Sequence, residues 1–226
     1  MALILNIETA TEVCSVALGL DGRVLCSETI CTPNQHAGQT TVLIARLFEQ
    51  SDYSLQDLHA VAVSSGPGSY TGLRIGASVA KGICFALHLP LIAVPTLKGI
   101  AQGARERFPE ADLLIPVIDA RRQEVYAARY TSELVNTQPV YSWIIEPGDL
   151  DPLHQAGTVV IAGGKGAEKA QEILDNDHFI YDPIAASADF LVPLSELAYR
   201  QKKFEEVASF TPFYLKPPNI TTPKTL

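Results

Sequence analysis

The first thirty residues constrain the fold most, because they contain three predicted strands and no helix. Leu3–Thr9 is a mostly apolar run, and Val13–Leu20 follows it almost at once. Asp21 and Gly22 then form a two-residue sequence typical of a tight hairpin turn, which leads into Val24–Ile30. The sheet therefore opens as an antiparallel meander. This excludes a plain dinucleotide-binding fold, in which the first strand leads directly into a helix.

After the meander, helices and strands alternate. Ser65–Ser69 predicts a tight turn, in which Ser69 is placed to cap the helix that follows. The hydrophobic periodicity predicts helices over 37–51, 70–87 and 96–107, and strands over 60–64 and 91–94. The resulting order, βββαβαβα, is the repeat unit of the actin-like, or sugar-kinase-like, superfamily.

A second and shorter copy of this unit begins at Leu113. Strands are expected over 113–119, 123–130, 140–145, 158–162 and 178–181, and helices over 167–174 and 187–203. We therefore predict an α/β protein of two related actin-like (ribonuclease-H-like) lobes, each a mixed sheet flanked by helices, with the second lobe reduced. The expected division is residues 1–100 for lobe one, with the helix in 187–210 packing back on it, 101–186 for lobe two, and 216–226 for a flexible tail.

Composition and charge limit the partners of this chain. It has 226 residues, of which 47% are hydrophobic, and a net charge of −8. No segment approaches the roughly 20 apolar residues of a membrane span, and the N-terminus lacks a basic leader, so a cytoplasmic protein is expected. Stable tRNA binding by one chain normally needs a basic stripe, because phosphate neutralisation supplies most of the non-specific affinity. We therefore expect neither direct stable tRNA binding by this chain alone nor membrane association.

Three stretches resemble the TsaB family, and they follow one another in that family's order. They are residues 7–18, 65–76 and 118–126, of which the middle stretch, Ser65-Gly66-Pro67-Gly68-Ser69-Tyr70-Thr71-Gly72-Leu73-Arg74-Ile75-Gly76, is the most specific. The first stretch departs from the family pattern in having Glu8 where aspartate is common. The resemblance implies a non-catalytic subunit that dimerises with the related catalytic subunit TsaD. Together with the ATPase TsaE, the pair would transfer threonylcarbamoyl to adenosine-37 of tRNA.

The turns that hold phosphate in actin-like ATPases are incomplete here. Such turns need small residues, because backbone N–H groups must approach the phosphates closely. In the second lobe, Arg121 and Arg122 stand where glycine is needed, although the turn at 162–166 keeps its glycines. We therefore expect no cofactor, while a nucleotide at a junction between subunits stays open. The candidate vestigial nucleotide-like turns contain Glu8, Thr9, Thr11, Asp119, Gly163 and Gly164.

No catalytic constellation is evident, and no catalytic or metal site is predicted. The catalytic relative carries two histidines four residues apart on a helix, a spacing that places both on one face for metal binding. Here His36 is present, but the second position is Thr40. Two alternatives stay open. A stand-alone actin-like ATPase or small-molecule kinase would need two intact phosphate turns, and a metallopeptidase-like enzyme would need the missing histidine.

A stripe of small residues predicts a partner surface. Gly72, Gly76 and Ala80 lie four apart on the helix over 70–87 and so share one face. Glycine inside a helix costs about 1 kcal/mol relative to alanine, so close approach of another helix is expected. Packing of the stripe on its own sheet is the alternative. The predicted interface, with TsaD or with a second copy when TsaD is absent, consists of His36, Thr40, Leu43, Leu47, Tyr70, Gly72, Leu73, Gly76 and Ala80.

Overall fold

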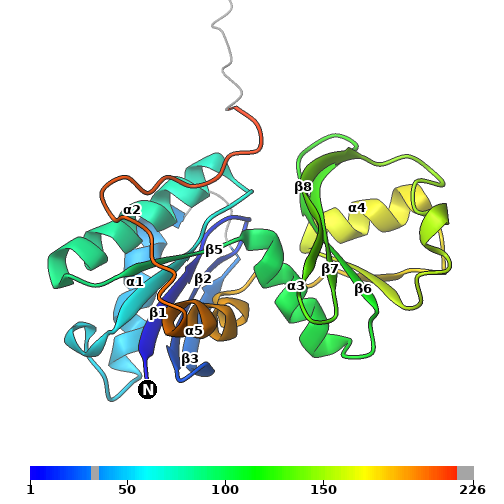
Figure 1. Cartoon of the computed structure of the whole chain (residues 1–226). Coiled ribbons are helices and arrows are strands. Elements are labelled where there is room, and N and C mark those ends of the chain that lie inside the picture. The colour runs from blue at the N-terminus through cyan, green and yellow to red at the C-terminus, as the bar shows by residue number, and fades with distance from the viewer. Residues whose placement is uncertain (32–35, 218–226) are drawn as a thin grey trace, which may run out of the picture.

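The computed structural model describes residues 1–31 and 36–217, without the side chains of 36–38. It consists of two α/β lobes that lie side by side (Figure 1). The sheet of lobe one has the order β3-β2-β1-β4-β5. β1 pairs antiparallel with β2 and parallel with β4, so the meander lies at one edge of a mixed sheet. The strands are β1 (Leu3–Glu8), β2 (Cys14–Leu20), β3 (Arg23–Ile30), β4 (Ala60–Ser64) and β5 (Leu91–Val94).

Helices cover both faces of this sheet. α1 (His36–Glu49) and α2 (Tyr70–Leu87) pack on one face, where Leu5, Leu43 and Leu47 belong to one buried cluster. The other face is covered by the short η3 (Ala188–Leu191) and by α5 (Val192–Arg200), with Leu191 against Ile4. β1 is covered on both faces, so all six of its residues are buried and its apolar residues do not simply alternate with exposed polar ones.

Lobe two repeats the same strand order, β8-β7-β6-β9-β10, with α4 (Gly164–Leu174) and α3 (Thr96–Arg107) packed against it. Its strands are β6 (Leu113–Asp119), β7 (Glu124–Thr131), β8 (Asn136–Ile144), β9 (Val159–Ala162) and β10 (Ile180–Asp182). Between β8 and β9 the chain forms only the short η2 (Asp151–Leu153), where lobe one has α1. The predicted class, two related actin-like lobes with the second one reduced, is confirmed.

Several local predictions are confirmed, and two elements differ. Ser69 caps α2 by accepting from the Gly72 N–H at 3.2 Å. Asp21 and Gly22 form a turn in which both residues are left-handed, with φ of 53° and 79°. The helix expected over 187–203 is instead η3 followed by α5. The strand expected over 140–145 begins earlier, at Asn136, and β7 and β8 pair with register shifts around Arg129.

The connections between the lobes run through α3 and the C-terminal region. The predicted lobe boundary at residue 100 falls inside α3, whose Leu97 and Ile100 join the core of lobe two. Lys216, at which the predicted tail begins, donates to Glu124 of β7 at 2.6 Å, and 218–226 lie outside the described residues. None of the helices in the described ranges is long and apolar enough to cross a membrane.

Candidate functional site

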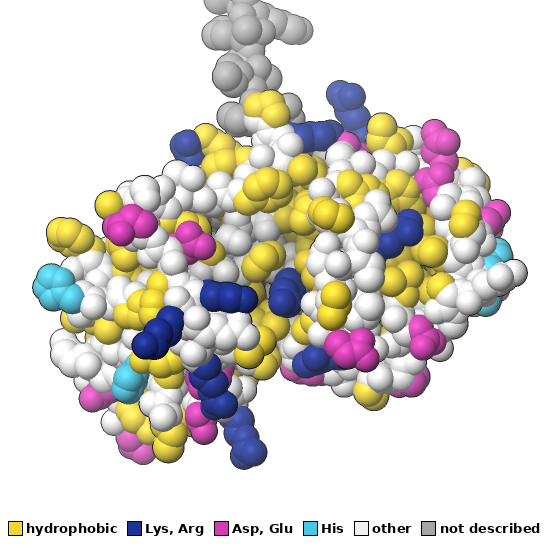
Figure 2. Space-filling view, viewed as in Figure 1, with side chains coloured by type: hydrophobic (Ala, Val, Ile, Leu, Met, Phe, Trp, Pro, Cys, Tyr) yellow, Lys and Arg dark blue, Asp and Glu magenta, His cyan; other side chains and the backbone are white. Residues whose placement is uncertain are grey.

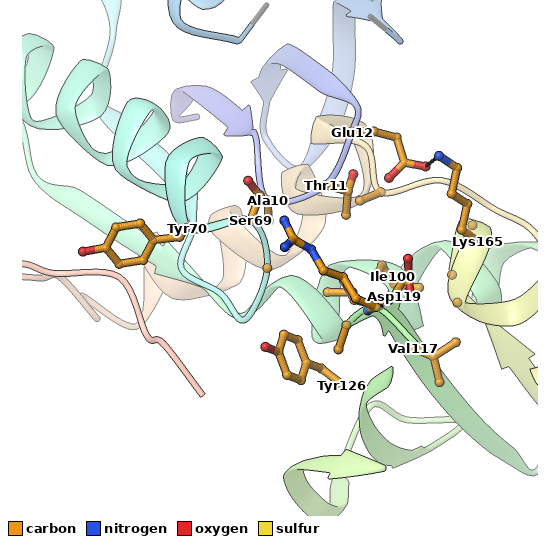
Figure 3. Close-up of a pocket in the computed structure, with 18 of the residues that line it drawn as sticks. Ala10, Thr11, Glu12, Ser69, Tyr70, Ile100, Val117, Asp119, Tyr126 and Lys165 are labelled. Atoms are coloured by element: carbon orange, nitrogen blue, oxygen red, sulfur yellow. Dashed lines mark hydrogen bonds and ion pairs between the residues drawn. The ribbon is translucent and has the colours of Figure 1, made fainter. Parts of the chain in front are cut away.

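A cavity of about 750 Å³ lies between the two lobes, where turns from both sheets face each other (Figure 3). Lobe one contributes the turn after β1 and the start of α2. Lobe two contributes the end of β6 and the turn before α4. The space-filling view shows a furrow between the lobes, with Lys and Arg side chains scattered around it rather than in one stripe (Figure 2). The residues that line the cavity include Thr11, Glu12, Ser69, Ile100, Asp119, Arg121, Tyr126, Gly163, Gly164, Lys165 and Tyr214.

The turn of lobe one uses its polar groups internally. Glu8 is buried at the end of β1, and its Oε1 accepts from the Ala10 N–H at 2.6 Å. Burial raises the pKa of Glu8 to about 7, an effect that hydrogen bonds from Ala10, Ser64 and Thr9 oppose. Thr9 is also buried, and its hydroxyl donates to the Gly72 carbonyl at 2.8 Å. Of the predicted residues in this turn, only Thr11 lines the cleft.

The opposing turn of lobe two is occupied by bulky, charged residues. Arg121 and Arg122 both have left-handed backbones, with φ of 72° and 52°. Residues other than glycine adopt this conformation at a cost of roughly 1–2 kcal/mol each. Asp119 accepts from the Arg121 N–H at 3.0 Å and forms an ion pair with Lys169. Its carboxylate is therefore already neutralised within the lobe.

The glycine-rich turn before α4 is shaped by packing on β6. A Cβ at Gly163 would lie 1.9 Å from the Val117 carbonyl oxygen, so a side chain does not fit there. The Gly163 N–H donates to the Asp182 carbonyl at 3.0 Å, and the Gly164 N–H donates to the Ile184 carbonyl at 2.8 Å. These donors are satisfied by the protein itself, so this turn offers few free N–H groups to a phosphate.

An ion pair between Glu12 and Lys165 crosses the cleft, and no metal centre is evident in the described part of the chain. Lys165 of α4 lies 3.8 Å from Glu12 of lobe one (Figure 3). Among residues 1–31 and 36–217, no group of three or more His, Cys, Asp or Glu side chains is arranged to hold a metal ion. The side chain of His36, the first position of the histidine pattern, lies outside the described residues.

The prediction that the stripe of small residues on α2 faces a partner is wrong. Gly72, Gly76 and Ala80 are buried within lobe one. A Cβ at Gly76 would lie 2.3 Å from the Thr9 hydroxyl oxygen, and one at Gly72 would lie 2.0 Å from the Thr9 carbonyl oxygen. The small residues do permit close approach, but the element that approaches is the chain after β1. Leu73, which also belongs to the predicted interface, is fully buried too.

The predicted interface residues of α1 are likewise part of the core. Thr40, Leu43 and Leu47 are buried, and Thr40 contacts the Cys14 thiol of β2 at 3.4 Å. Tyr70 is half-buried between its own neighbours: the Arg74 guanidinium lies 4.2 Å from its ring centroid, and the Tyr214 ring lies 4.7 Å away. The apolar stripe of α1 therefore packs on the sheet of its own lobe, as expected for an amphipathic helix.

A second concave surface lies on the outer side of these two helices. It is an apolar groove of about 630 Å³ between α1 and α2, which we call the α1–α2 groove. At its side, no atom of the described residues lies within 4 Å of a Cβ added at Gly82, so among these residues this face of α2 is open. The sequence analysis did not identify the residues of this groove. Gly82, a glycine on a different face of α2 from the small stripe, was the feature that indicated a second open surface. The groove is lined by Thr41, Ile44, Ala45, Phe48, Glu49, Tyr53, Ser54, Leu55, Gln56, Ser78, Val79, Gly82 and Ile83.

Known proteins are similar to this chain in sequence and in fold. The TsaB protein of Escherichia coli K12 is 43% identical over 127 residues, which are 56% of this chain and 54% of that protein. The TsaB protein of Haemophilus influenzae is 28% identical over 94% of this chain and 93% of its own length. The solved structure of YeaZ from Pseudomonas aeruginosa superimposes with a TM-score of 0.82 at 30% identity, covering 95% of this chain and all of that one.

The repeated strand order and the cleft between facing turns define a two-lobed actin-like α/β protein. The family model of the tRNA N6-adenosine threonylcarbamoyltransferase TsaD matches residues 31–223. The similar proteins named above are TsaB proteins, and the chain belongs to the TsaB family, the tRNA threonylcarbamoyladenosine biosynthesis proteins.

Proposed function

We propose that this chain is a non-catalytic subunit in the transfer of threonylcarbamoyl to adenosine-37 of tRNA. It acts by dimerising with the catalytic subunit TsaD, in a machinery that includes the ATPase TsaE. Its relatives are named for threonylcarbamoyladenosine biosynthesis, which supports the pathway. A cytoplasmic location fits this role.

The observation that carries the partner role is the exposed apolar α1–α2 groove. Phe48 and Ile83 lie half-buried in it, and the Phe85 side chain near the end of α2 is 79% exposed. Ser78 and Gly82 lie four residues apart on α2, so they place two small residues on one open face. Small residues let a second helix approach closely, and the apolar walls gain free energy when water leaves them.

We take TsaD as the occupant of the groove. The TsaD family model matches this chain over 31–223, a range that includes both helices. A related subunit therefore has an equivalent helix pair, and two such pairs packed face to face make a helix bundle. A second copy of this chain satisfies the same geometry when TsaD is absent.

The state of the cleft supports a role without catalysis. The turn at Arg121 and Arg122 is bulky, and the Gly163 and Gly164 N–H groups are already bonded. Phosphate transfer needs such donors free and aimed at the phosphates. The net charge of −8 also argues that stable tRNA binding resides in a partner.

The proposal is tested by reconstitution with TsaD, TsaE and the adenylate-forming enzyme, with and without this chain. Modification of tRNA should collapse when the chain is omitted, and the chain alone should hydrolyse no ATP. Equal modification without the chain would refute the function. ATP turnover by the chain alone, lost in Glu8→Ala, would instead favour a stand-alone ATPase.

The interface is tested by filling the groove. Gly82→Leu should weaken binding to TsaD by about tenfold or more, because a leucine there occupies the space of the approaching helix. The matched control is Gln171→Leu, which adds the same side chain to an exposed position of α4. Unchanged TsaD affinity of folded Gly82→Leu would exclude the groove. Loss of self-association alone would assign the groove to a homodimer.

A further inference from the structure

The C-terminal segment, residues 204–217, crosses from lobe one to lobe two. It leaves α5 and returns over lobe one, where the Glu205 N–H donates to the Leu91 carbonyl at 2.9 Å. Further along, the Phe213 N–H donates to the Ser65 carbonyl at 2.7 Å. The segment then reaches Glu124 of β7 in lobe two through Lys216. Figure 1 shows it as the orange-to-red trace that passes over lobe one and ends between the lobes.

The docking of this segment on lobe one is specific. Lys81 of α2 donates to the carbonyls of Ala208 and Phe210 at 3.0 Å and 3.1 Å. Phe210 is buried in the cluster beneath α2, and the Tyr214 ring lies 4.7 Å from the Tyr70 ring at a tilt of 44°. A Cβ at Gly66 would lie 2.3 Å from the Phe213 carbonyl oxygen. The turn before α2 therefore accommodates this segment only because residue 66 is glycine.

The contact with lobe two is an ion pair held in a small polar network. The Lys216 ammonium donates to Glu124 Oε2 at 2.6 Å, and the Ser142 hydroxyl donates to the same carboxylate. The Lys216 and Ser142 hydrogen bonds hold the pKa of Glu124 below its usual value. Lys169 also reaches this strand, donating to the Glu124 carbonyl at 3.1 Å. The Glu124 side chain is only 18% exposed, so it is fixed better than a free surface carboxylate.

The end of the segment also forms part of the cleft. Residues 214–217 line the cavity between the lobes, close to the residues that Figure 3 labels. A second ion pair, Glu12 with Lys165, links the lobes across the same cavity. Glu12, Lys165 and Lys216 therefore all line the cavity. Glu12 and Lys165 form one ion pair between the lobes, and Lys216 of the C-terminal segment forms the other with Glu124.

We propose that residues 204–217 are a strap that ties lobe two to lobe one across the cleft, with Lys216 and Glu124 as its latch. When the latch is broken, the end of the strap leaves the cleft and the lobes separate more easily. This device is independent of the proposed partner role, because neither latch residue lines the α1–α2 groove.

Hydrogen exchange of the full chain, followed by mass spectrometry, tests the latch. Lys216→Ala and Glu124→Gln should each speed exchange about threefold at the end of the strap, residues 214–217, and in residues 118–126 of the facing turn, as expected for an ion pair of this exposure. The double variant should exchange no faster than either single variant, because both remove one interaction. The matched control is Lys202→Ala, an exposed lysine near the start of the strap with no ion pair among the described residues.

A second measurement reads the contact directly. A zero-length carbodiimide joins an amine to a carboxylate only when they touch, so the wild-type chain should yield a Lys216–Glu124 cross-link. Wild-type exchange rates in both single variants, a Lys202→Ala effect equal to that of Lys216→Ala, or absence of the cross-link would each overturn the strap. Additive effects in the double variant would also overturn it, because they would show that the two residues act separately.

Discussion

Two glycines of α2 should respond in opposite directions to the same substitution. Gly82→Ala places a methyl group in open space, since no atom in the described part of the chain lies within 4 Å of the added Cβ. Alanine is better than glycine inside a helix by about 1 kcal/mol, so this variant should be more stable than wild type by that amount. Gly76→Ala gains the same helix propensity but meets the Thr9 hydroxyl oxygen at 2.3 Å and Val63 Cγ2 at 3.3 Å.

The clash at Gly76 has a calculable consequence. The Thr9 hydroxyl is buried and donates to the Gly72 carbonyl at 2.8 Å, so moving it breaks that hydrogen bond. Loss of a buried hydrogen bond costs about 1–3 kcal/mol. Overpacking of a well-packed core costs about 1–3 kcal/mol more. After the gain in propensity of about 1 kcal/mol, Gly76→Ala should lose about 3 kcal/mol, so the two variants should differ by about 4 kcal/mol.

Urea denaturation followed by circular dichroism measures this difference. With a slope of about 1–3 kcal/mol per molar urea, a gap of about 4 kcal/mol separates the two midpoints by about 1 M or more. Ser78→Ala, on the exposed face of the same helix, provides the baseline for an alanine substitution. Equal midpoints for Gly76→Ala and Gly82→Ala would refute the reasoning, because they would show that a methyl group at residue 76 meets no costly obstruction.

Three further changes test other parts of the structure. The raised pKa of Glu8 means that the folded state keeps a proton which the unfolded state releases, so the contribution of Glu8 to stability is fully present below pH 4.5 and is lost as pH rises to about 7. In Glu8→Gln, the loss of unfolding free energy between pH 4.5 and 7 should be smaller by about 3 kcal/mol, measured by denaturation across that range. An unchanged pH profile in this variant would contradict the raised pKa of Glu8. Arg107→Ala leaves the buried Asp182 carboxylate without its partner at 2.9 Å and should cost about 2 kcal/mol, which a second change, Asp182→Asn, should partly restore. Full stability of Arg107→Ala alone would show that the pair contributes nothing. Gly19→Ala meets Val192 Cγ1 at 2.6 Å, so it should lower the melting temperature unless combined with Val192→Ala, and a failure of that rescue would argue against the contact.

The order of elements was predictable because each local signal agreed with the next. Asp21 and Gly22 specify a turn that needs left-handed residues, and Ser69 provides a helix cap, so both follow from neighbouring residues alone. The helix that begins at residue 187 was overestimated. Pro193 at the start of α5 favours a new helix there, and the preceding residues form η3 instead.

The candidate cleft was predictable only in part. The turns at Thr11, Asp119 and Gly163 follow strands that are related by the repeat, and the carboxyl ends of such strands lie on the same side of each lobe. The sequence does not indicate that Glu8 turns inward onto Ala10, nor that Lys169 neutralises Asp119. These are contacts between atoms whose distance depends on packing across the fold.

The sequence by itself determined the two-lobed fold, the reduced second lobe and the family, because periodicity, turn chemistry and motif spacing are local properties of the chain. The tertiary structure alone decided which face of α2 is available to a partner. Gly76 and Gly82 look alike in the sequence, but a Cβ at Gly76 would meet Thr9, which is distant in the chain, whereas one at Gly82 would meet no atom of residues 1–31 and 36–217 whose placement is described. The bridge from Lys216 to Glu124 has the same origin, since residues far apart in the chain meet only after both lobes have formed.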